Sequence, residues 1–349
     1  MPAHPPGSAP RHSLHIVSGK GGTGKTTIAA ALACALATAG RRVLVCEVEG
    51  RQGIAQLFEA PELRGAEERR LLRTPAGGQV YGLSVDAEDA LLEYLDTFYR
   101  LGLAGRALDR FGVIDFATSI APGLRDVLLT GKVYEAVRRR MKGRPNSYDA
   151  VVLDAPPTGR IAQFLNVHEA VAGLAKVGPI HAQADSIMTV LRSPATVVHL
   201  VTLLEDMPVT ETADAVRELA PTKITVGSVI ANMITPSPLT DAQLAAAAAG
   251  ELSLHVDGLD AAQNRRLAAE LAADASRIEL QRSCRTTLDT LGLPVLEVAF
   301  DPAGIDADGL LTIAGSLAEQ LPDEVAGPPT EPAADGGRDT ARGVRKAAR

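Results

Sequence analysis

Short runs of apolar and β-branched residues alternate with longer helical patterns along most of the chain. The runs are almost continuously apolar, which is typical of strands buried on both faces of a parallel sheet. The intervening helical patterns provide the crossovers that parallel strands require. We therefore expect an α/β fold, with a doubly wound, mostly parallel sheet flanked by helices. The predicted strands cover residues 14–18, 42–48, 79–85, 150–155, 195–202, 223–232 and 294–300.

A helical insertion is predicted at about residues 86–142. Apolar residues between Leu91 and Tyr99 are spaced to share one helix face. Aromatic residues make up 3% of the chain and are concentrated in and around this insertion. Packing of a separate helical layer explains the concentration best, because buried aromatic side chains usually serve cores. A surface for a partner is the alternative.

The two ends differ in composition from the rest of the chain. Residues 1–12 and 322–349 are rich in Pro, Gly, Ala and charged residues, with almost no large apolar side chain. Such segments bury too little apolar surface to offset the entropy lost on ordering, so we expect a disordered leader and a disordered tail. Residues 13–321 are predicted to form a single domain, and their length also allows two compact domains.

Charge and cysteine content limit the classes of function. The chain has 349 residues and a formal net charge of −7, which disfavours binding to nucleic acid through bulk charge. Its three cysteines are scattered, as expected for reduced thiols in the cytoplasm rather than for disulfides or a zinc site. No apolar run approaches the roughly 20 residues of a transmembrane helix. We expect a soluble, cytoplasmic protein with no transmembrane segment and no nucleic-acid partner.

A glycine-rich stretch, Gly19 to Thr26, fits the phosphate-loop pattern G-x-x-x-x-G-K-[ST]. It follows a predicted strand and opens a helical pattern, the setting that distinguishes a phosphate loop from a chance match. Glycines allow backbone N–H groups to turn toward phosphate oxygens, Lys25 would reach the β- and γ-phosphates, and the Thr26 hydroxyl would ligate Mg²⁺. The predicted nucleotide-binding residues of the loop are Gly19, Lys20, Gly21, Gly22, Thr23, Gly24, Lys25, Thr26 and Thr27.

The loop also contains a second lysine, Lys20, five residues before Lys25. The arrangement K-G-G-x-G-K-T-T, Lys20 to Thr27, resembles the deviant phosphate loop of chromosome-partitioning, septum-positioning, nitrogenase iron-protein and arsenite-pump ATPases. In that class the early lysine reaches across a dimer interface to the nucleotide of the other subunit. The resemblance implies that Lys20 is a catalytic residue acting in trans, in a homodimer or in a heterodimer with a paralogous ATPase. A solvated loop lysine is the alternative.

Asp154 ends an apolar strand and precedes a Pro-Pro-Thr-Gly turn. A carboxylate at the carboxyl end of a parallel strand is well placed to hold a Mg²⁺-bound water, and the turn can respond to a γ-phosphate. The stretch YDAVVLDAPPTGR, Tyr148 to Arg160, resembles the D-T-A-P-T-G-H signature of the ArsA-type ATPases, which include arsenite pumps and tail-anchored-protein targeting factors. The departures are Ala155 and Pro156 in place of Thr-Ala, and Arg160 in place of His.

Further matches to the ArsA-type family extend over about residues 13–321. Glu205, Glu211 and Thr212 fit the family pattern P-E-x-L-S-x-x-E-T after the strand at 195–202. Asn232 ends a strand that is similar to the one whose terminal Asn contacts adenine. The stretch PVLEVAFDPAGIDADGL resembles the last strand and its adenine-covering loop. The resemblance therefore implies a P-loop NTPase with ATP and Mg²⁺ as cofactors, and with Thr26 and Asp154 at the metal.

The first switch departs from the family pattern S-T-D-P-A-H. The chain has CEVEGRQGIAQLF here, and counting back from Leu57-Phe58 places Glu49 where the family has its water-positioning Asp. Glu47 is the other candidate. Glutamate keeps the carboxylate and lengthens its arm by one methylene, and attack geometry is sensitive to about 1 Å. We therefore expect a catalytic Glu49 with slow hydrolysis, or a switch carboxylate that serves structure alone.

Two functions from different classes follow. The first is a Mg²⁺-dependent dimeric ATPase that couples nucleotide state to an unknown protein client. The second is a catalytically weak nucleotide-binding subunit that pairs with a more active paralogue; a positioning ATPase of the partitioning type ranks third. The chain lacks the converging cysteines of arsenite pumps and the C-x-x-C clip of targeting factors. It looks like a shorter bacterial branch of anion-transporting ATPases.

Overall fold

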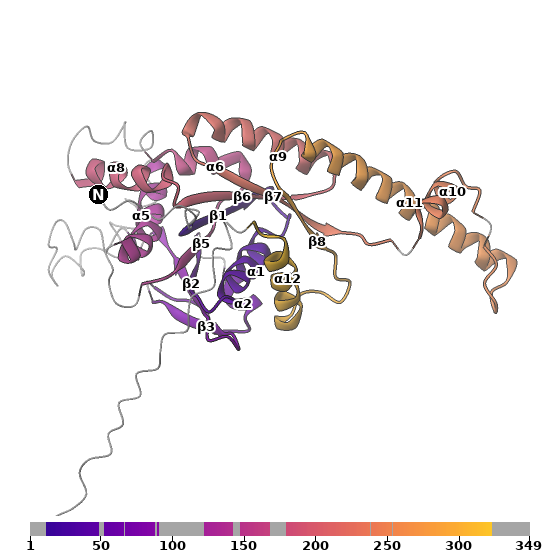
Figure 1. The fold of residues 1–349 in the computed structure, drawn as a ribbon, viewed down its shortest axis with the longest axis horizontal. Helices are drawn as coiled ribbons and strands as arrows, with labels where there is room; N and C mark the ends of the chain where they lie inside the picture. Colours follow the sequence, from indigo (N-terminus) through magenta and orange to yellow (C-terminus); the bar gives the residue numbers. More distant parts are fainter. Residues whose placement is uncertain are drawn as a thin grey trace, which may run out of the picture.

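The computed structural model describes residues 12–48, 52–65, 67–87, 89–90, 122–141, 147–167, 179–237, 239–252 and 254–322. Within these residues, eight strands form one sheet in the order β3-β4-β2-β5-β1-β6-β7-β8 (Figure 1). Neighbouring strands run parallel except β3, which is antiparallel to β4. The strands are β1 (Leu14–Gly19), β2 (Arg42–Val48), β3 (Arg69–Arg73), β4 (Gln79–Val85), β5 (Ala150–Asp154), β6 (Thr196–Leu203), β7 (Val226–Ile234) and β8 (Val295–Ala299).

Helices cover both faces of the sheet (Figure 1). Successive β1 residues supply the two cores, because side chains alternate along a strand: Ile16 belongs to one apolar cluster and Val17 to the other. One face carries α1 (Lys25–Ala37), α2 (Gly53–Leu57) and α12 (Ala307–Gln320). The other carries α5 (Pro122–Met141), α6 (Thr158–Leu165), α8 (Pro179–Leu191) and α9 (Asp206–Leu219), which is followed by the short 3₁₀-helix η1 (Ala220–Thr222).

The predicted α/β fold with a mostly parallel sheet is confirmed. Each of the seven predicted strands corresponds to a strand of the sheet, and β3 is the addition. The sequence of β3, RRLLR, is rich in charge because this strand lies at the edge of the sheet. Helix α5 occupies the last part of the predicted insertion, whereas residues 91–121 lie outside the described residues. Most of the predicted leader and tail, residues 1–11 and 323–349, also lies outside them.

A helical hairpin between β7 and β8 was not predicted. It consists of α10 (Asp241–Ala248) and α11 (Ala261–Asp289), and it projects away from the sheet as an arm (Figure 1). Leu244 and Ala247 of α10 pack against Ala275 and Ile278 of α11. Near its C-terminal end, α11 packs instead on the sheet domain, where Leu288 joins a cluster with residues of β7.

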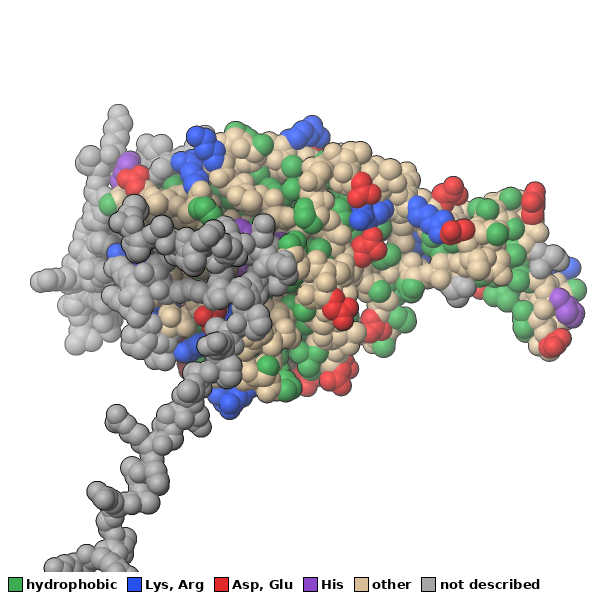
Figure 2. Space-filling view, in the orientation of Figure 1, with side chains coloured by type: hydrophobic (Ala, Val, Ile, Leu, Met, Phe, Trp, Pro, Cys, Tyr) green, Lys and Arg blue, Asp and Glu red, His purple; other side chains and the backbone are tan. Residues whose placement is uncertain are grey.

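The surface of this arm is charged. Figure 2 shows acidic and basic side chains interspersed along it, with apolar side chains between them. One ion pair, between Arg282 Nη2 and Asp241 Oδ1 at 2.5 Å, links the two helices of the hairpin. At the base of the arm, Arg285 Nε lies 2.8 Å from Glu297 Oε1 of β8. Of the described helices, none is long and apolar enough to cross a lipid bilayer.

Two histidines are buried side by side in the sheet, on β1 and β6. The rings of His15 and His199 stack with centroids 5.5 Å apart, and His199 Nδ1 lies 2.7 Å from Ser228 Oγ of β7. His15 Nε2 is buried and has no hydrogen-bond partner among the described residues. Burial lowers the pKa of His199 to about 3. Burial, then the neighbouring His199 and His12, also holds the pKa of His15 well below its ordinary value, so both rings are neutral in the folded chain.

Candidate active site

The glycine-rich loop connects the carboxyl end of β1 to the first turn of α1. Gly22 and Gly24 have φ angles of 87° and 84°, in the left-handed region that favours glycine. A Cβ atom added to Gly24 would lie 2.4 Å from Asn232 Nδ2 at the end of β7, so this position has no room for a side chain. The loop therefore has the open backbone that a phosphate cradle requires.

Hydrogen bonds within the loop hold Lys25 close to it. The Lys25 ammonium donates to the Lys20 carbonyl at 3.1 Å, and the Thr23 hydroxyl donates to the same carbonyl at 2.9 Å. Lys25 is only 8% exposed. Asn232 Nδ2 donates to the Thr23 carbonyl at 2.8 Å, so β7 is fastened to the loop. Contact between Asn232 and adenine stays a prediction.

Thr26 and Asp154 meet where β5 ends. The Thr26 hydroxyl donates to Asp154 Oδ2 at 2.6 Å, although the two residues are 128 positions apart. Asp154 pairs in register with Val17 of β1, which places its carboxylate beside the glycine-rich loop. A hydroxyl and a carboxylate are hard oxygen ligands of the kind that Mg²⁺ prefers. These two residues therefore fit the predicted Mg²⁺ site.

Glu47 lies next to Asp154 at the same edge of the sheet, because β2 and β5 pair in parallel register at these two residues. Its side chain is buried, and its two carboxylate oxygens accept from the backbone N–H groups of Gly53, at 3.1 Å, and Ile54, at 3.0 Å. A carboxylate at a helix N-terminus satisfies N–H groups that have no partner within the helix. Glu47 therefore anchors the start of α2. Glu49 lies outside the described residues.

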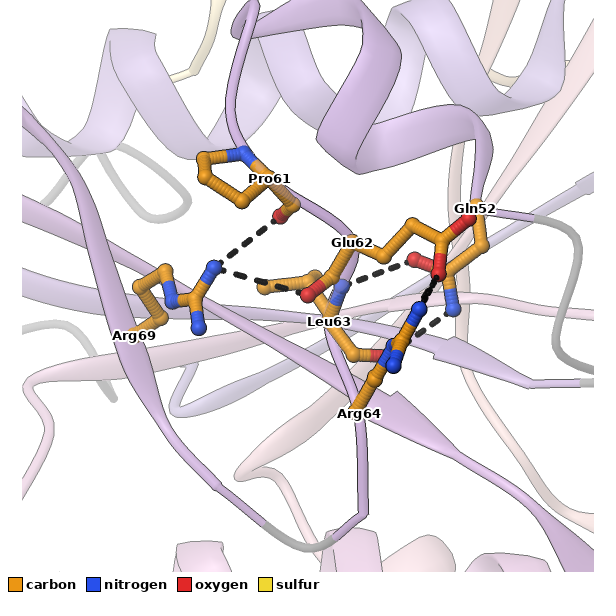
Figure 3. Close-up of polar contacts among 6 residues, drawn as sticks. All are labelled: Gln52, Pro61, Glu62, Leu63, Arg64 and Arg69. Carbon is orange, nitrogen blue, oxygen red and sulfur yellow. Dashed lines mark hydrogen bonds and ion pairs between the residues drawn. The ribbon is translucent and has the colours of Figure 1, made fainter.

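The segment after β2 is fastened again at Gln52, which has a left-handed φ of 59°. Its side-chain amide makes two hydrogen bonds to the backbone of Leu63 (Figure 3). Nε2 donates to the Leu63 carbonyl and Oε1 accepts from the Leu63 N–H, both at 2.8 Å. A Cβ on the next residue, Gly53, would lie 2.9 Å from Thr26 Cγ2. The start of α2 therefore packs directly against the predicted Mg²⁺ ligand.

Lys20 points to α9 of its own chain. Its ammonium nitrogen lies 2.6 Å from Glu211 Oε1, and both side chains are about one third exposed, at 32% and 36%. The predicted role of Lys20 in trans is not tested by a single chain. The structure adds a carboxylate partner in cis, from a residue that the sequence pattern had singled out for another reason.

The Pro-Pro-Thr-Gly turn after β5 is bound to β1 and leads into α6. The Ser18 hydroxyl donates to the Pro156 carbonyl at 2.7 Å, and the Ala155 N–H donates to the Val17 carbonyl at 2.9 Å. Arg160, which departs from the family pattern, reaches Asp126 of α5 at 3.5 Å. The turn thus connects the candidate site to α6, whose Arg160 in turn contacts α5.

Several of the residues singled out from the sequence lie together in the structure. Lys25 and Thr26 follow the loop directly, Asp154 and Asn232 contact it from two strand ends, and Lys20 points from it to α9. Sequence reasoning missed the capping of α2 by Glu47 and the clip made by Gln52. The first has a weak sequence signal, an acidic residue shortly before a helix, whereas the second depends on a backbone partner that no motif marks.

Comparison with known proteins shows what this chain is similar to. The family described as anion-transporting ATPase matches residues 12–193. ATPase BagA of Mycobacterium tuberculosis is 51% identical over 316 residues, covering 88% of this chain and 93% of that protein. An arsenical pump-driving ATPase of Aquifex aeolicus is 28% identical over 155 residues, covering 44% of this chain and 48% of that protein. ATPase GET3 of Kluyveromyces lactis is 25% identical over 187 residues, covering 52% of each chain.

Proposed function

This chain belongs to the anion-transporting ATPase family, and on that premise we propose that it is a Mg²⁺-dependent dimeric switch that binds and hydrolyses ATP. The observation that carries the proposal is the hydrogen bond from Thr26 to Asp154 at the mouth of the glycine-rich loop, 2.6 Å long. It supports a shared role at one metal ion, because the two oxygens converge from α1 and β5. Nucleotide state would be passed to a protein client or partner of unknown identity, in the cytoplasm.

Lys25 and the turn after Asp154 have different tasks in this proposal. Bound Mg²⁺ would neutralise charge that develops during phosphoryl transfer. The Lys25 ammonium exchanges its acceptor, the Lys20 carbonyl, for phosphate oxygens, a short movement because Lys25 already lies inside the loop. The turn that starts at Ala155 would report the state of the site, since Ser18 joins it to β1 and it leads into α6, whose Arg160 contacts α5.

Glu49 is the proposed water-positioning carboxylate. Glu47, the other candidate, accepts one N–H on each oxygen, from Gly53 and Ile54, and these two bonds fix its carboxylate against the start of α2. Turning the carboxylate away from α2 would leave the buried Ile54 N–H unpaired, at a cost of about 1–3 kcal/mol, which disfavours Glu47 in the catalytic role. The proposal therefore gives Glu47 a structural task and Glu49 the chemical one.

Lys20 is proposed to act on the nucleotide of a partner subunit. The experiment mixes two inactive variants, Lys20→Ala and Lys25→Ala, and follows phosphate release at fixed total protein. In a mixed dimer both lesions fall in one composite site, whereas the other site keeps Lys25 in cis and Lys20 in trans, so we expect turnover to reappear in the mixture. The partner is a second copy of this chain or a paralogous ATPase. A Lys20→Ala subunit that turns over like the unaltered chain, or that no partner rescues, contradicts the role in trans.

The activity itself is tested by turnover with and without Mg²⁺. We expect phosphate release from ATP that stops when EDTA removes the metal and that is lost in Thr26→Ala. Slow turnover is expected if the longer arm of Glu49 places the water imperfectly. Tight ATP binding with no release at any protein concentration would instead support a catalytically weak subunit that pairs with a more active paralogue.

A further inference from the structure

The Lys20–Glu211 ion pair joins the nucleotide loop to α9 across 191 positions of sequence. The ammonium and the carboxylate are 2.6 Å apart, within the range of a charge-assisted hydrogen bond. A lysine that serves a partner's nucleotide must leave this carboxylate, because its ammonium cannot contact two distant anions at once. The position of Lys20 in a single chain is therefore the starting point of a competition.

Glu211 is held in place by the helix that bears it. The next residue, Thr212, is 1% exposed, and its hydroxyl donates to the Pro208 carbonyl at 2.8 Å within α9. Ala215, one turn further on, is buried in the apolar cluster on the face of the sheet that α9 covers. The backbone at Glu211 is thus fixed by packing, so the carboxylate stays where Lys20 reaches it.

The strength of the pair suits a releasable contact. Both side chains are about one third exposed, and exposed ion pairs contribute little, corresponding to at most about fivefold in an equilibrium. The phosphates of ATP carry more negative charge than one carboxylate, and a closed interface excludes the water that screens the attraction. Phosphate therefore displaces Glu211 only when a partner presents a loaded nucleotide.

We propose that Glu211 is a positioning residue that holds Lys20 within its own subunit until a nucleotide-loaded partner competes for it. The inference rests on the proposed function, since it needs Lys20 to act in trans. Glu211 then sets the protein concentration at which the dimer forms with ATP. Removing its charge frees Lys20 and favours association.

Cross-linking tests the cis contact directly in the unaltered protein. A water-soluble carbodiimide activates a carboxylate, a neighbouring amine attacks the acyl carbon, and a urea leaves as the amide forms. We expect a Lys20–Glu211 isopeptide, detected by peptide mass spectrometry, in nucleotide-free protein. Saturating ATP and Mg²⁺, added in a buffer without EDTA, should suppress this cross-link. A cross-link whose yield is the same with and without nucleotide overturns the proposal.

Concentration dependence tests the consequence. Glu211→Gln should lower the protein concentration for half-maximal ATP-dependent dimerisation, measured by sedimentation, by about two- to fivefold for each Lys20 released. Glu218→Gln, on the same helix and exposed, is the matched control and should leave it unchanged. In a Lys20→Ala background, Glu211→Gln should have no effect, because the charge it frees is gone.

The outcomes separate the inference from the proposed function. If Lys20→Ala is rescued in trans while Glu211→Gln behaves like Glu218→Gln, only the role of Glu211 is wrong. If Glu211→Gln weakens association, the carboxylate supports the dimer and the inference is overturned. If Lys20→Ala dimerises and turns over like the unaltered chain, the role of Lys20 fails and takes the inference with it.

Discussion

The two ends of β1 bury polar groups in opposite ways. At the carboxyl end, Ser18 and the loop that follows it bring together hydroxyl, ammonium and carboxylate groups that bond one another. Near the amino end, His15 and His199 are buried as neutral rings with Ser228 beside them. The carboxyl end places charged and polar groups in contact with one another, whereas the amino end keeps its buried rings neutral. The contrast shows that burial alone does not mark a functional site; the chemical character of the neighbours does.

Nucleotide binding should produce the largest difference between the two ends. ATP with Mg²⁺ at about 1,000 times Kd should stabilise the protein by about 4 kcal/mol, because the ligand binds the folded state alone. Lys25→Ala should lose most of this stabilisation, measured as the shift in Tm on adding nucleotide. His15→Gln is the control at the other end and should keep it. An unchanged shift in Lys25→Ala would contradict the assignment of the loop.

Turnover should distinguish the two glutamates at the carboxyl edge. Glu49→Gln should keep ATP affinity and lower turnover by about 10²-fold, equivalent to about 2.7 kcal/mol in the barrier, the scale of a positioned acid–base group. Glu47→Gln should instead lower the unfolding free energy, since an amide presents an N–H to one of the two backbone donors that Glu47 accepts. Equal turnover in Glu49→Gln and the unaltered chain would move the catalytic role elsewhere.

We expect acid to lower the unfolding free energy through His199. Burial lowers the pKa of His199 to about 3, below the ordinary value of 6.5, so between these pH values the unfolded chain binds a proton at this residue and the folded chain does not. The stability is present above about pH 6.5 and is lost as the pH falls toward 3. Between pH 7 and pH 5 the loss is about 2 kcal/mol for this residue. The neighbouring His12 lowers the pKa of His199 as well, after burial.

Urea unfolding at the two pH values measures this effect. His199→Asn removes the titration and keeps a polar group near Ser228, so its unfolding free energy should fall by about 2 kcal/mol less than that of the unaltered chain between pH 7 and pH 5. Parallel losses in the two proteins would show that His199 does not control the acid response.

A matched pair of serines should give the smallest effect. Ser18 donates to the Pro156 carbonyl and Ser228 bonds His199, both at 2.7 Å and both buried. Each Ser→Ala change should cost about 1 kcal/mol of unfolding free energy, the typical net contribution of one hydrogen bond. Ser18→Ala should also reduce the stabilisation by ATP, because it loosens the turn after Asp154. If Ser228→Ala reduces that stabilisation equally, the two ends are coupled and the comparison fails.

The strands could be predicted because parallel strands buried on both faces leave continuous apolar runs. The edge strand β3 was not predicted, since none of its five residues is buried and three of them are arginines. The α10–α11 arm escaped because it has no catalytic motif and little apolar surface to bury. Its helix starts did carry a signal: Thr240 with Gln243, and Asp260 with Gln263, form capping boxes that the sequence shows as T-x-x-Q and D-x-x-Q.

The candidate site was predictable where strand ends fix it. Asp154 and the loop after Gly19 converge because parallel strands end at one edge, so their meeting follows from the fold class. The contact between Lys20 and Glu211 could not be predicted, since it depends on how α9 packs on the sheet. The two hydrogen bonds from Gln52 to Leu63 depend on the left-handed backbone of Gln52, which no sequence pattern predicts.

The length of α11 has a mechanical consequence. Its 29 residues span roughly 43 Å at 1.5 Å per residue, and Cys284 and Leu288 seat its base against Val209 of α9. A tilt of about 10° at that base displaces the far end by roughly 7 Å, from the same helix length. Helix α9 also bears Glu211 and packs on α6, which follows the turn after Asp154. The base of the arm therefore packs on α9, the helix whose Glu211 contacts Lys20. Any small tilt of α11 at this contact would become a larger displacement at the tip of the arm.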